Sequence, residues 1–361
     1  MASPAVEVDV DGVSVRLSSP DKPFFPELGE NGSKRHLFDY VVAMSGTADD
    51  PGPLLRALHR RPTFLQRFPD GITGDEVYQK HLPRKHPDYL HATLIEFPSK
   101  RTGHALCPTI PADLAWASQM GTVTFHSWPT VDIGDEEKPN NHPDQLRIDL
   151  DPPDGSDFDE VRGVALDVVK PVLDDLKLPG FVKTSGSRGI HVFIPVNPQW
   201  DFIATRRAVI ALGREMERRA PQRITTSWWK EERGGRVFID YNQNARDRSM
   251  ASAYSVRRSA TAKVSTPVTW TELVDVDPAE LTITTVADLV AKRGDPWAEM
   301  TSAAVGIESL LEMVARDDAE GLGDLPYPPS FPKMPGEPPR VQPSRKVPEH
   351  WDQWGNRRPL A

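Results

Sequence analysis

Cysteine is almost absent from this 361-residue sequence, because Cys107 is the only one. A single cysteine excludes an internal disulfide and a zinc site built from several cysteines. No run of about 18 apolar residues occurs, so no transmembrane helix is expected. The N-terminal stretch Met1–Val10 has acidic residues and no basic segment, unlike a secretory signal. We therefore expect a cytoplasmic protein, long enough for two packed modules or one large one.

Basic residues are outnumbered overall, because 43 lysines and arginines stand against 52 aspartates and glutamates, and the formal net charge is −9. The distribution is uneven: residues 181–263 hold 16 lysines and arginines against 7 aspartates and glutamates. A cationic segment inside an acidic protein is typical of a surface that faces phosphate. Part of the excess falls on one predicted helix, where we expect an ordinary solvated face. Its arginines are Arg206, Arg207, Arg214, Arg218 and Arg219.

The apolar stretch Leu146–Pro152 contains two carboxylates, Asp149 and Asp151. Side chains at i and i+2 of a strand share one face, so these two would stand side by side while Ile148 and Leu150 enter a core. Two carboxylates on one face repel unless a cation lies between them, and Mg²⁺ or Mn²⁺ suits such ligands. Taken alone, the pair also fits a strand end with two solvated aspartates.

A glycine-rich loop, Thr184–His191, follows the paired carboxylates. Its glycines allow backbone N–H groups to turn inward as an anion-binding nest, and Ser185, Arg188 and His191 add further donors. This combination suits a triphosphate. The alternative is a tight hairpin whose serines satisfy their own turn.

A third carboxylate, Asp240, stands in the apolar run Val237–Tyr241. Three aspartates would complete a site for two divalent ions that activate an attacking hydroxyl and stabilise a leaving pyrophosphate. By itself, Asp240 would more simply cap the end of a strand.

The expected elements alternate as β-α-β-β-α-β-β in the second half, which indicates an α+β fold rather than a doubly wound parallel sheet. Pro171 should kink or split the helix predicted over 158–176. We expect 224–229 and 237–241 to pair as a hairpin. The predicted modules are an N-terminal α/β module (1–130), a module that carries the three carboxylates (131–303), and a helix with a proline-rich tail packed on or beside the body (304–361).

The order DLDP, TSGSRGIHVFIP and VFIDYNQN followed by AYSVR resembles the polymerase domain of the bacterial end-joining ligases, DNA ligase D, within the archaeo-eukaryotic primase superfamily. The similarity extends upstream to PDKPFFPE, RFPDG, VYQKH and TVTFHSWP, and so covers about residues 10–300. It implies a primase-polymerase fold, with an RRM-like catalytic sheet packed against the N-terminal α/β module. Since no ligase or nuclease motif accompanies it, we expect a stand-alone polymerase.

The resemblance implies a template-directed nucleotidyltransferase that adds ribonucleotides or deoxyribonucleotides at DNA gaps or double-strand break ends, as in gap filling during non-homologous end joining. Mn²⁺ or Mg²⁺ would be held by Asp149, Asp151 and Asp240, which are also the catalytic residues. The implied nucleotide contacts are His126, Ser185, Arg188, His191 and Arg257. The implied DNA contacts are Lys22, Lys34, Arg67, Tyr78 and Lys80, the first two on the 5′-phosphate of the broken or gapped strand.

The sequence departs from the family pattern at three positions. Val77-Tyr78 replaces two adjacent phenylalanines that often stack on bases, Arg188 replaces a common lysine, and Gln66 stands where some relatives are basic. Arginine keeps the charge but binds phosphate through a planar fork. These changes concern the preferred DNA end rather than the chemistry.

The expected partners are gapped or broken duplex DNA with a 5′-phosphate, nucleoside triphosphates, Ku and a separate DNA ligase, at the nucleoid and not at a membrane. The alternatives are a primase that starts strands de novo, a two-metal nuclease or phosphohydrolase, and a non-catalytic binder of DNA ends. The three carboxylates argue against a silent binder, and the Ser/Arg/His loop argues against hydrolysis.

Overall fold

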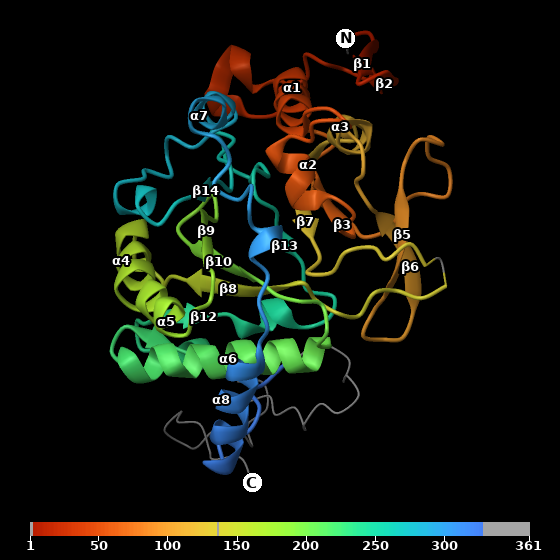
Figure 1. Ribbon diagram of the computed structural model, residues 1–361. Coiled ribbons are helices and arrows are strands. Elements are labelled where there is room, and N and C mark those ends of the chain that lie inside the picture. Colours follow the sequence, from red (N-terminus) through yellow and green to blue (C-terminus); the bar gives the residue numbers. More distant parts are fainter. Residues whose placement is uncertain (1–2, 136, 328–361) are drawn as a thin grey trace, which may run out of the picture.

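Two six-stranded sheets form the centre of the computed structural model, which describes residues 3–135 and 137–327 (Figure 1). The first sheet has the order β13-β7-β3-β6-β5, with β4 paired to β3. Its strands are β3 (Thr63–Arg67), β4 (Val77–Gln79), β5 (Ala92–Glu96), β6 (Thr102–Leu106), β7 (Thr122–Ser127) and β13 (Met250–Ala251).

The helices α1 (Lys34–Ser45), α2 (Pro53–Leu58) and α3 (Pro111–Gln119) accompany this first sheet. An N-terminal hairpin of β1 (Val6–Val10) and β2 (Val13–Leu17) packs on α3. Its turn is the Asp11-Gly12 pair, and both residues have positive φ, as a two-residue hairpin turn of type I′ requires.

The second sheet has the order β11-β12-β8-β10-β9-β14. Its strands are β8 (Gln145–Asp151), β9 (Phe181–Thr184), β10 (Ile190–Pro195), β11 (Ile224–Thr225), β12 (Val237–Ile239) and β14 (Pro267–Val268). One face is fully apolar: Ile148 and Leu150 of β8 join Val192 of β10 in the core. Asp149 and Asp151 lie on the opposite face, as the alternation of the strand predicts. The α+β fold class is confirmed.

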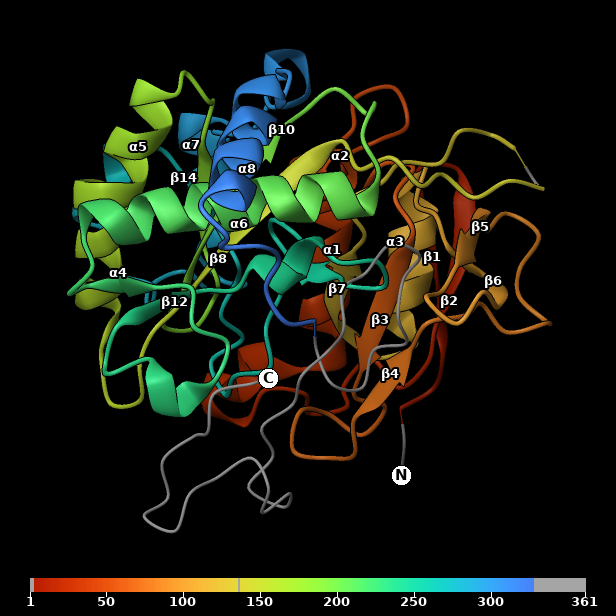
Figure 2. The same ribbon diagram turned by 90° about the horizontal axis from the view of Figure 1, so that it is seen from below.

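Helices cover the apolar face of the second sheet (Figures 1 and 2). They are α4 (Phe158–Val164), a π-helical turn (Ala165–Val169), α5 (Lys170–Asp175) and α6 (Phe202–Arg219). The π-helical turn ends two residues before Pro171, whose missing N–H cannot bond to the carbonyl four residues back. The predicted helix over 158–176 forms, and its backbone stays helical through Pro171, so the chain does not split there.

The hairpin predicted from 224–229 and 237–241 is wrong, because β11 and β12 run parallel. A parallel pair needs a crossover between its strands rather than a turn. Residues 226–236 supply it, and Arg233 holds this connection by donating to the carbonyls of Ser227 and Trp228. β12 then lies antiparallel to β8, which carries Asp240 to the paired carboxylates.

A short connecting segment links the two sheets. β13 pairs with β7 in the first sheet, and β14, only 15 residues later in the chain, pairs with β9 in the second. Arg147 adds a side-chain link by donating to the Ser127 carbonyl at 2.8 Å. The polar face of the second sheet therefore looks toward β7 of the first.

The C-terminal helix α8 (Glu308–Ala319) packs against α6 on the side away from the sheet (Figures 1 and 2). A short helix, α7 (Val286–Arg293), precedes it and lies near α1. The predicted proline-rich tail from residue 328 onward falls outside the described residues. Within residues 3–135 and 137–327, no helix has the length and apolar character needed to cross a membrane.

Candidate metal and nucleotide site

The three predicted aspartates converge. Asp149 and Asp151 project from β8, Asp240 follows β12, and one carboxylate oxygen from each lies within 4.8 Å of the other two. The convergence is fixed by the backbone, because the N–H of Asp240 donates to the carbonyl of Asp149 at 2.9 Å. Strand alternation places the first two on one face, and pairing of β12 with β8 adds the third.

Burial and mutual repulsion raise the pKa of the clustered carboxyls. Burial is the largest cause at Asp149, followed by the charges of Asp151 and Asp240. Burial and the charge of Asp240 raise the pKa of Asp151 to about 6, and burial also raises the pKa of Asp240. Three partly buried like charges are unfavourable unless a cation joins them. Their hard oxygen donors fit Mg²⁺ or Mn²⁺.

Asp240 also caps the 3₁₀ turn Tyr241–Asn244. Its Oδ1 accepts the Asn242 N–H at 3.0 Å, and its Oδ2 accepts from the Gln243 amide at 2.9 Å. The capping role of Asp240 and its predicted role as a metal ligand are therefore compatible. The cap uses one lone pair on each oxygen and leaves the carboxylate oriented toward its two neighbours.

His191 of β10 lies opposite Asp149 in the sheet register, with Nε2 3.4 Å from Asp149 Oδ1. Its other ring nitrogen, Nδ1, is 2.7 Å from the ammonium of Lys183. Burial and the charges of Lys183 and Arg257 hold the pKa of His191 well below its usual range. The low pKa favours the neutral imidazole, and the contact with Lys183 holds the ring in place.

The loop between β9 and β10 is a tight hairpin that also faces the site. Ser185 Oγ accepts from the N–H groups of Ser187 and Gly189, so this serine does satisfy its own turn. Gly186 has φ +74°, and a Cβ there would lie 2.4 Å from the Arg257 side chain. Arg188 points outward and donates to the Ser156 carbonyl at 2.9 Å. The loop thus packs against Arg257, while Arg188 lies at its exposed edge.

Arg257 and His126 lie near His191 from the side of the first sheet. The charge of Arg257 contributes to lowering the pKa of both histidines, and it offsets part of the rise in the pKa of Asp149. Burial, followed by Arg257, lowers the pKa of His126 to about 3. Its Nε2 is 3.3 Å from the Gln66 side-chain oxygen, and its ring contacts Tyr78 at a centroid distance of 5.3 Å.

Three predicted DNA-binding cations gather at a second location in the N-terminal module. Lys22 donates to the Pro69 carbonyl and to Asp70 at 2.6 Å. Lys34 is buried and donates to the Ser18 carbonyl at 2.7 Å. Burial, then the charges of Lys22 and Arg67, lowers the pKa of Lys34 to about 8. We call Lys22, Lys34 and Arg67 the basic cluster.

The remaining predicted DNA contacts lie along β4. Tyr78 is 42% exposed, and its hydroxyl lies 2.8 Å from Ser249 Oγ. Lys80 pairs with Asp247 at 2.9 Å and lies over the Phe64 ring at 5.2 Å. The one exposed ring on this strand is therefore Tyr78, which leaves a single aromatic platform.

Sequence reasoning missed Lys183, a fully buried lysine of β9 whose pKa burial holds well below its usual range. The signal was available: counting back from the loop pairs it with His191 across the hairpin. Lys230 and Arg233 were also missed, although their charges act on Asp151. They lie in the crossover that the sequence suggested was a simple turn.

Comparisons with known proteins show which protein family and which relatives this chain resembles. Residues 33–297 match the LigD primase-polymerase domain. The multifunctional non-homologous end joining protein LigD of Mycolicibacterium smegmatis is 28% identical over 324 residues, covering 88% of this chain and 40% of that protein. The LigD protein of Pseudomonas aeruginosa is 30% identical over 291 residues, covering 79% and 32%. The chain thus spans less than half the length of these curated relatives.

A solved structure shares the fold. The polymerase domain of Mycobacterium tuberculosis Ligase D, in complex with DNA, matches with a TM-score of 0.71 and 27% identity. The match covers 80% of this chain and 99% of that domain. The two sheets and the carboxylate cluster described above therefore occur within a fold already seen bound to DNA in that relative.

Proposed function

This chain belongs to the LigD primase-polymerase family of nucleotidyltransferase-type DNA polymerases, and on that premise we propose that it extends a DNA 3′ hydroxyl opposite a template at gaps or double-strand break ends. The observation that carries the proposal is the convergence of Asp149, Asp151 and Asp240 beside His191 and Arg257. Carboxylates next to anion-binding donors suit the transfer of a nucleotide from its triphosphate.

Asp149, Asp151 and Asp240 would hold two divalent ions, for which we propose Mn²⁺ or Mg²⁺. Bound ions of this kind lower the pKa of an attacking hydroxyl and neutralise charge on the leaving pyrophosphate. The protein's contribution is to keep three oxygens within 4.8 Å of one another on two paired strands. That arrangement sets the positions of the ligand oxygens before the substrates arrive.

The nucleotide would lie against the polar face between β10 and β7. Arg257 supplies a fixed positive charge for the triphosphate, and the neutral His191 supplies a directed hydrogen bond. Ser185, Arg188 and His126 would complete the contacts to phosphates, sugar or base. Lys183 would act from behind His191, as the group that orients the imidazole.

The DNA would approach along the first sheet. The basic cluster supports binding of a 5′-phosphate, because it holds like charges close enough to shift the pKa of Lys34. Tyr78 and Lys80 would meet the template strand. The names of the relatives support end joining as the setting, with Ku and a DNA ligase as partners that co-purification on broken DNA would test.

One assay separates the candidate activities. The protein is incubated with Mn²⁺, labelled nucleotide and either a primed gapped duplex or an unprimed template. We expect the primer to lengthen in a template-dependent manner on the gapped duplex. New strands on the unprimed template would favour a primase, shortened strands a nuclease, and no product on either DNA a non-catalytic binder.

A further inference from the structure

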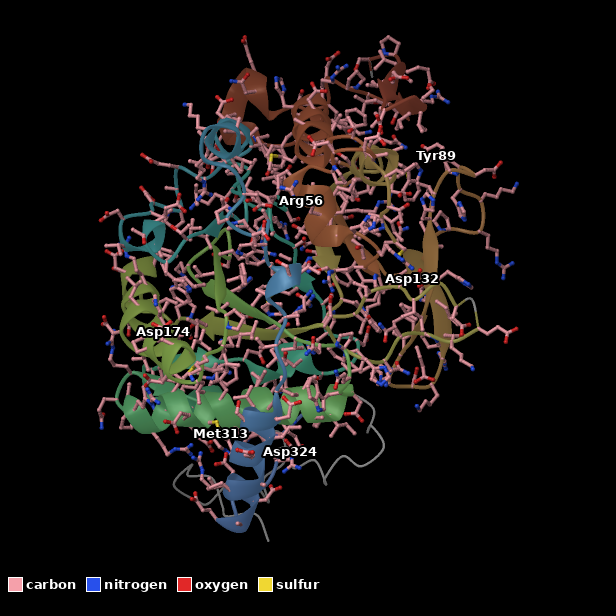
Figure 3. The ribbon with its side chains drawn as sticks, in the orientation of Figure 1. Arg56, Tyr89, Asp132, Asp174, Met313 and Asp324 are labelled. Atoms are coloured by element: carbon pink, nitrogen blue, oxygen red, sulfur yellow. The ribbon has the colours of Figure 1, made fainter. Side chains whose placement is uncertain are left out.

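The family match ends at residue 297, but the described chain continues across the back of the second sheet to Tyr327. After α8, the segment Asp324–Tyr327 runs beside α6. We call these four residues the strap. Figure 3 labels Asp324 next to α8, under α6. The strap ends at Tyr327, which is buried in a cluster with Phe64, Trp128 and Phe202.

The strap surrounds Arg206, whose side chain is fully buried. The guanidinium donates to Asp324 Oδ1 at 2.6 Å, to the Leu325 carbonyl at 2.8 Å and to Asn242 Oδ1 at 2.9 Å. The Tyr327 ring covers it at 3.6 Å. A buried guanidinium is strongly unfavourable without such partners, so the strap is needed to keep Arg206 inside the protein. The solvated face expected for this helix is therefore wrong for Arg206, whereas Arg218 and Arg219 are exposed as expected.

The same strap holds the turn that follows Asp240. The Pro326 carbonyl accepts from the Tyr241 hydroxyl at 3.2 Å and from the Asn242 amide at 3.1 Å. Asn242 therefore has its side chain fixed by the strap and Arg206, while its backbone N–H donates to Asp240 Oδ1 at 3.0 Å. A continuous set of hydrogen bonds connects the strap to the third carboxylate.

We propose that the strap, together with Arg206 and Asn242, positions Asp240 for metal binding, so that residues beyond the family match complete the metal site. The inference rests on the metal role proposed for Asp240. Groups that orient a metal ligand from behind commonly determine how tightly the metal binds. The strap residues are positioning residues, because none of them touches the reacting atoms.

The test measures Mn²⁺ binding to the full chain by electron paramagnetic resonance, without DNA or nucleotide. Asp324→Asn should weaken Mn²⁺ affinity about 10-fold, and Asp324→Glu should recover much of it by restoring the charge. The matched control is Asp318→Asn, which breaks the Arg207–Asp318 pair at the same helix interface without touching the Asp240 turn. It should bind Mn²⁺ as the wild type does.

A second variant keeps the test informative if Asp324→Asn does not fold. Tyr327→Leu removes the ring over Arg206 but keeps the ion pair, and should weaken Mn²⁺ binding in the same direction, by roughly threefold. Hydrogen exchange of residues 240–244 should rise in both strap variants and stay unchanged in Asp318→Asn.

Asp240→Asn separates this inference from the proposed function. If Asp240→Asn loses Mn²⁺ binding while both strap variants keep wild-type affinity, the strap proposal is wrong. If Asp240→Asn itself binds Mn²⁺ normally, the proposed metal site is wrong instead.

Discussion

The carboxylate cluster and the basic cluster each hold like charges together, but the protein treats the two groups differently. The carboxylates are directed at one another and have raised pKa values. The cations are turned toward oxygen atoms of the protein: Lys22 toward Asp70, Lys34 toward Ser18 and Arg67 toward Met120. Asp70 is 77% exposed, and exposed pairs of this kind are weak. The first site thus suits a cation, and at the second site the proposed phosphate would replace the weak partner of Lys22.

Substitutions in the carboxylate cluster should have the largest effect on primer extension. Asp149→Asn, Asp151→Asn and Asp240→Asn should each lower primer extension by more than about 10³-fold, because loss of an essential group removes most of a site's catalysis. Binding of gapped DNA should change little. Single-turnover extension and DNA titration measure the two quantities; extension at the wild-type rate by any of these variants would refute the assignment.

The same substitutions should stabilise the metal-free protein, since each removes one of three repelling charges. We expect Asp149→Asn to raise the free energy of unfolding by about 1 kcal/mol without metal. With Mn²⁺ present, the wild type should have the higher free energy of unfolding, because only the wild type is stabilised by binding the ion. Denaturant melts with and without Mn²⁺ test this, and a less stable metal-free variant would contradict it.

The next effect concerns the triphosphate donors. Arg257→Ala should raise the Michaelis constant for nucleotide about 10- to 100-fold, the equivalent of one charge-assisted hydrogen bond. His191→Ala should act in the same direction. Arg188→Ala is the matched comparison, because its side chain is exposed and bonded to Ser156, and we expect a smaller change. Nucleotide titrations that show no difference between Arg257→Ala and wild type would make Arg257 structural.

A smaller effect should appear at the basic cluster. The wild type should prefer a gap with a 5′-phosphate over one with a 5′-hydroxyl by about 10-fold at low salt. The double variant Lys22→Ala/Lys34→Ala should lose this preference yet extend an open primer. Asp70→Asn should strengthen it, because Lys22 is then released for phosphate. Equal binding of both gaps by the wild type would exclude a phosphate site here.

The smallest effect is the pH dependence of that preference. Burial and its cationic neighbours lower the pKa of Lys34 to about 8, so the ammonium is charged at pH 7 and largely neutral at pH 9. The preference for 5′-phosphate should therefore fall roughly threefold over that range, following the loss of the proton. The Lys34→Arg variant should show the same preference for 5′-phosphate across this pH range. A preference that rises with pH would contradict this assignment.

The sequence predicted the carboxylate site well because its parts are local. Alternation along one strand places Asp149 and Asp151 together, and the hairpin that contains Ser185 carries His191, which the pairing of β10 with β8 then brings opposite Asp149. The apolar run Val237–Tyr241 added Asp240, and the resemblance to the family added Arg257 and His126; all three come from distant parts of the chain. Their approach depends on strand order, and the hydrophobic pattern of single strands does not determine that order.

Two features that the sequence did not predict are the pairing of β11 with β12 and the ion pairs of α6. The parallel contact of β11 with β12 was missed because two short strands with a glycine turn favour a hairpin. The arginines of α6 were expected in solvent because the acidic partners Asp317, Asp318 and Asp324 lie more than 100 residues later. The roles predicted for individual site residues, and the module boundaries, stay predictions.

The connecting segment of the two sheets bears on how the chain folds during synthesis. Strand β7 receives its neighbour β13 only after every strand of the second sheet except β14 has been made, since Ser127 pairs with Met250. Backbone and side chains of residues 252–256 complete the same edge, through Ser252, Ser255 and Val256. An N-terminal fragment emerging first from the ribosome would thus expose an unpaired strand edge. The two halves should consequently fold as one cooperative unit, and separate expression of residues 1–130 should yield an aggregation-prone product.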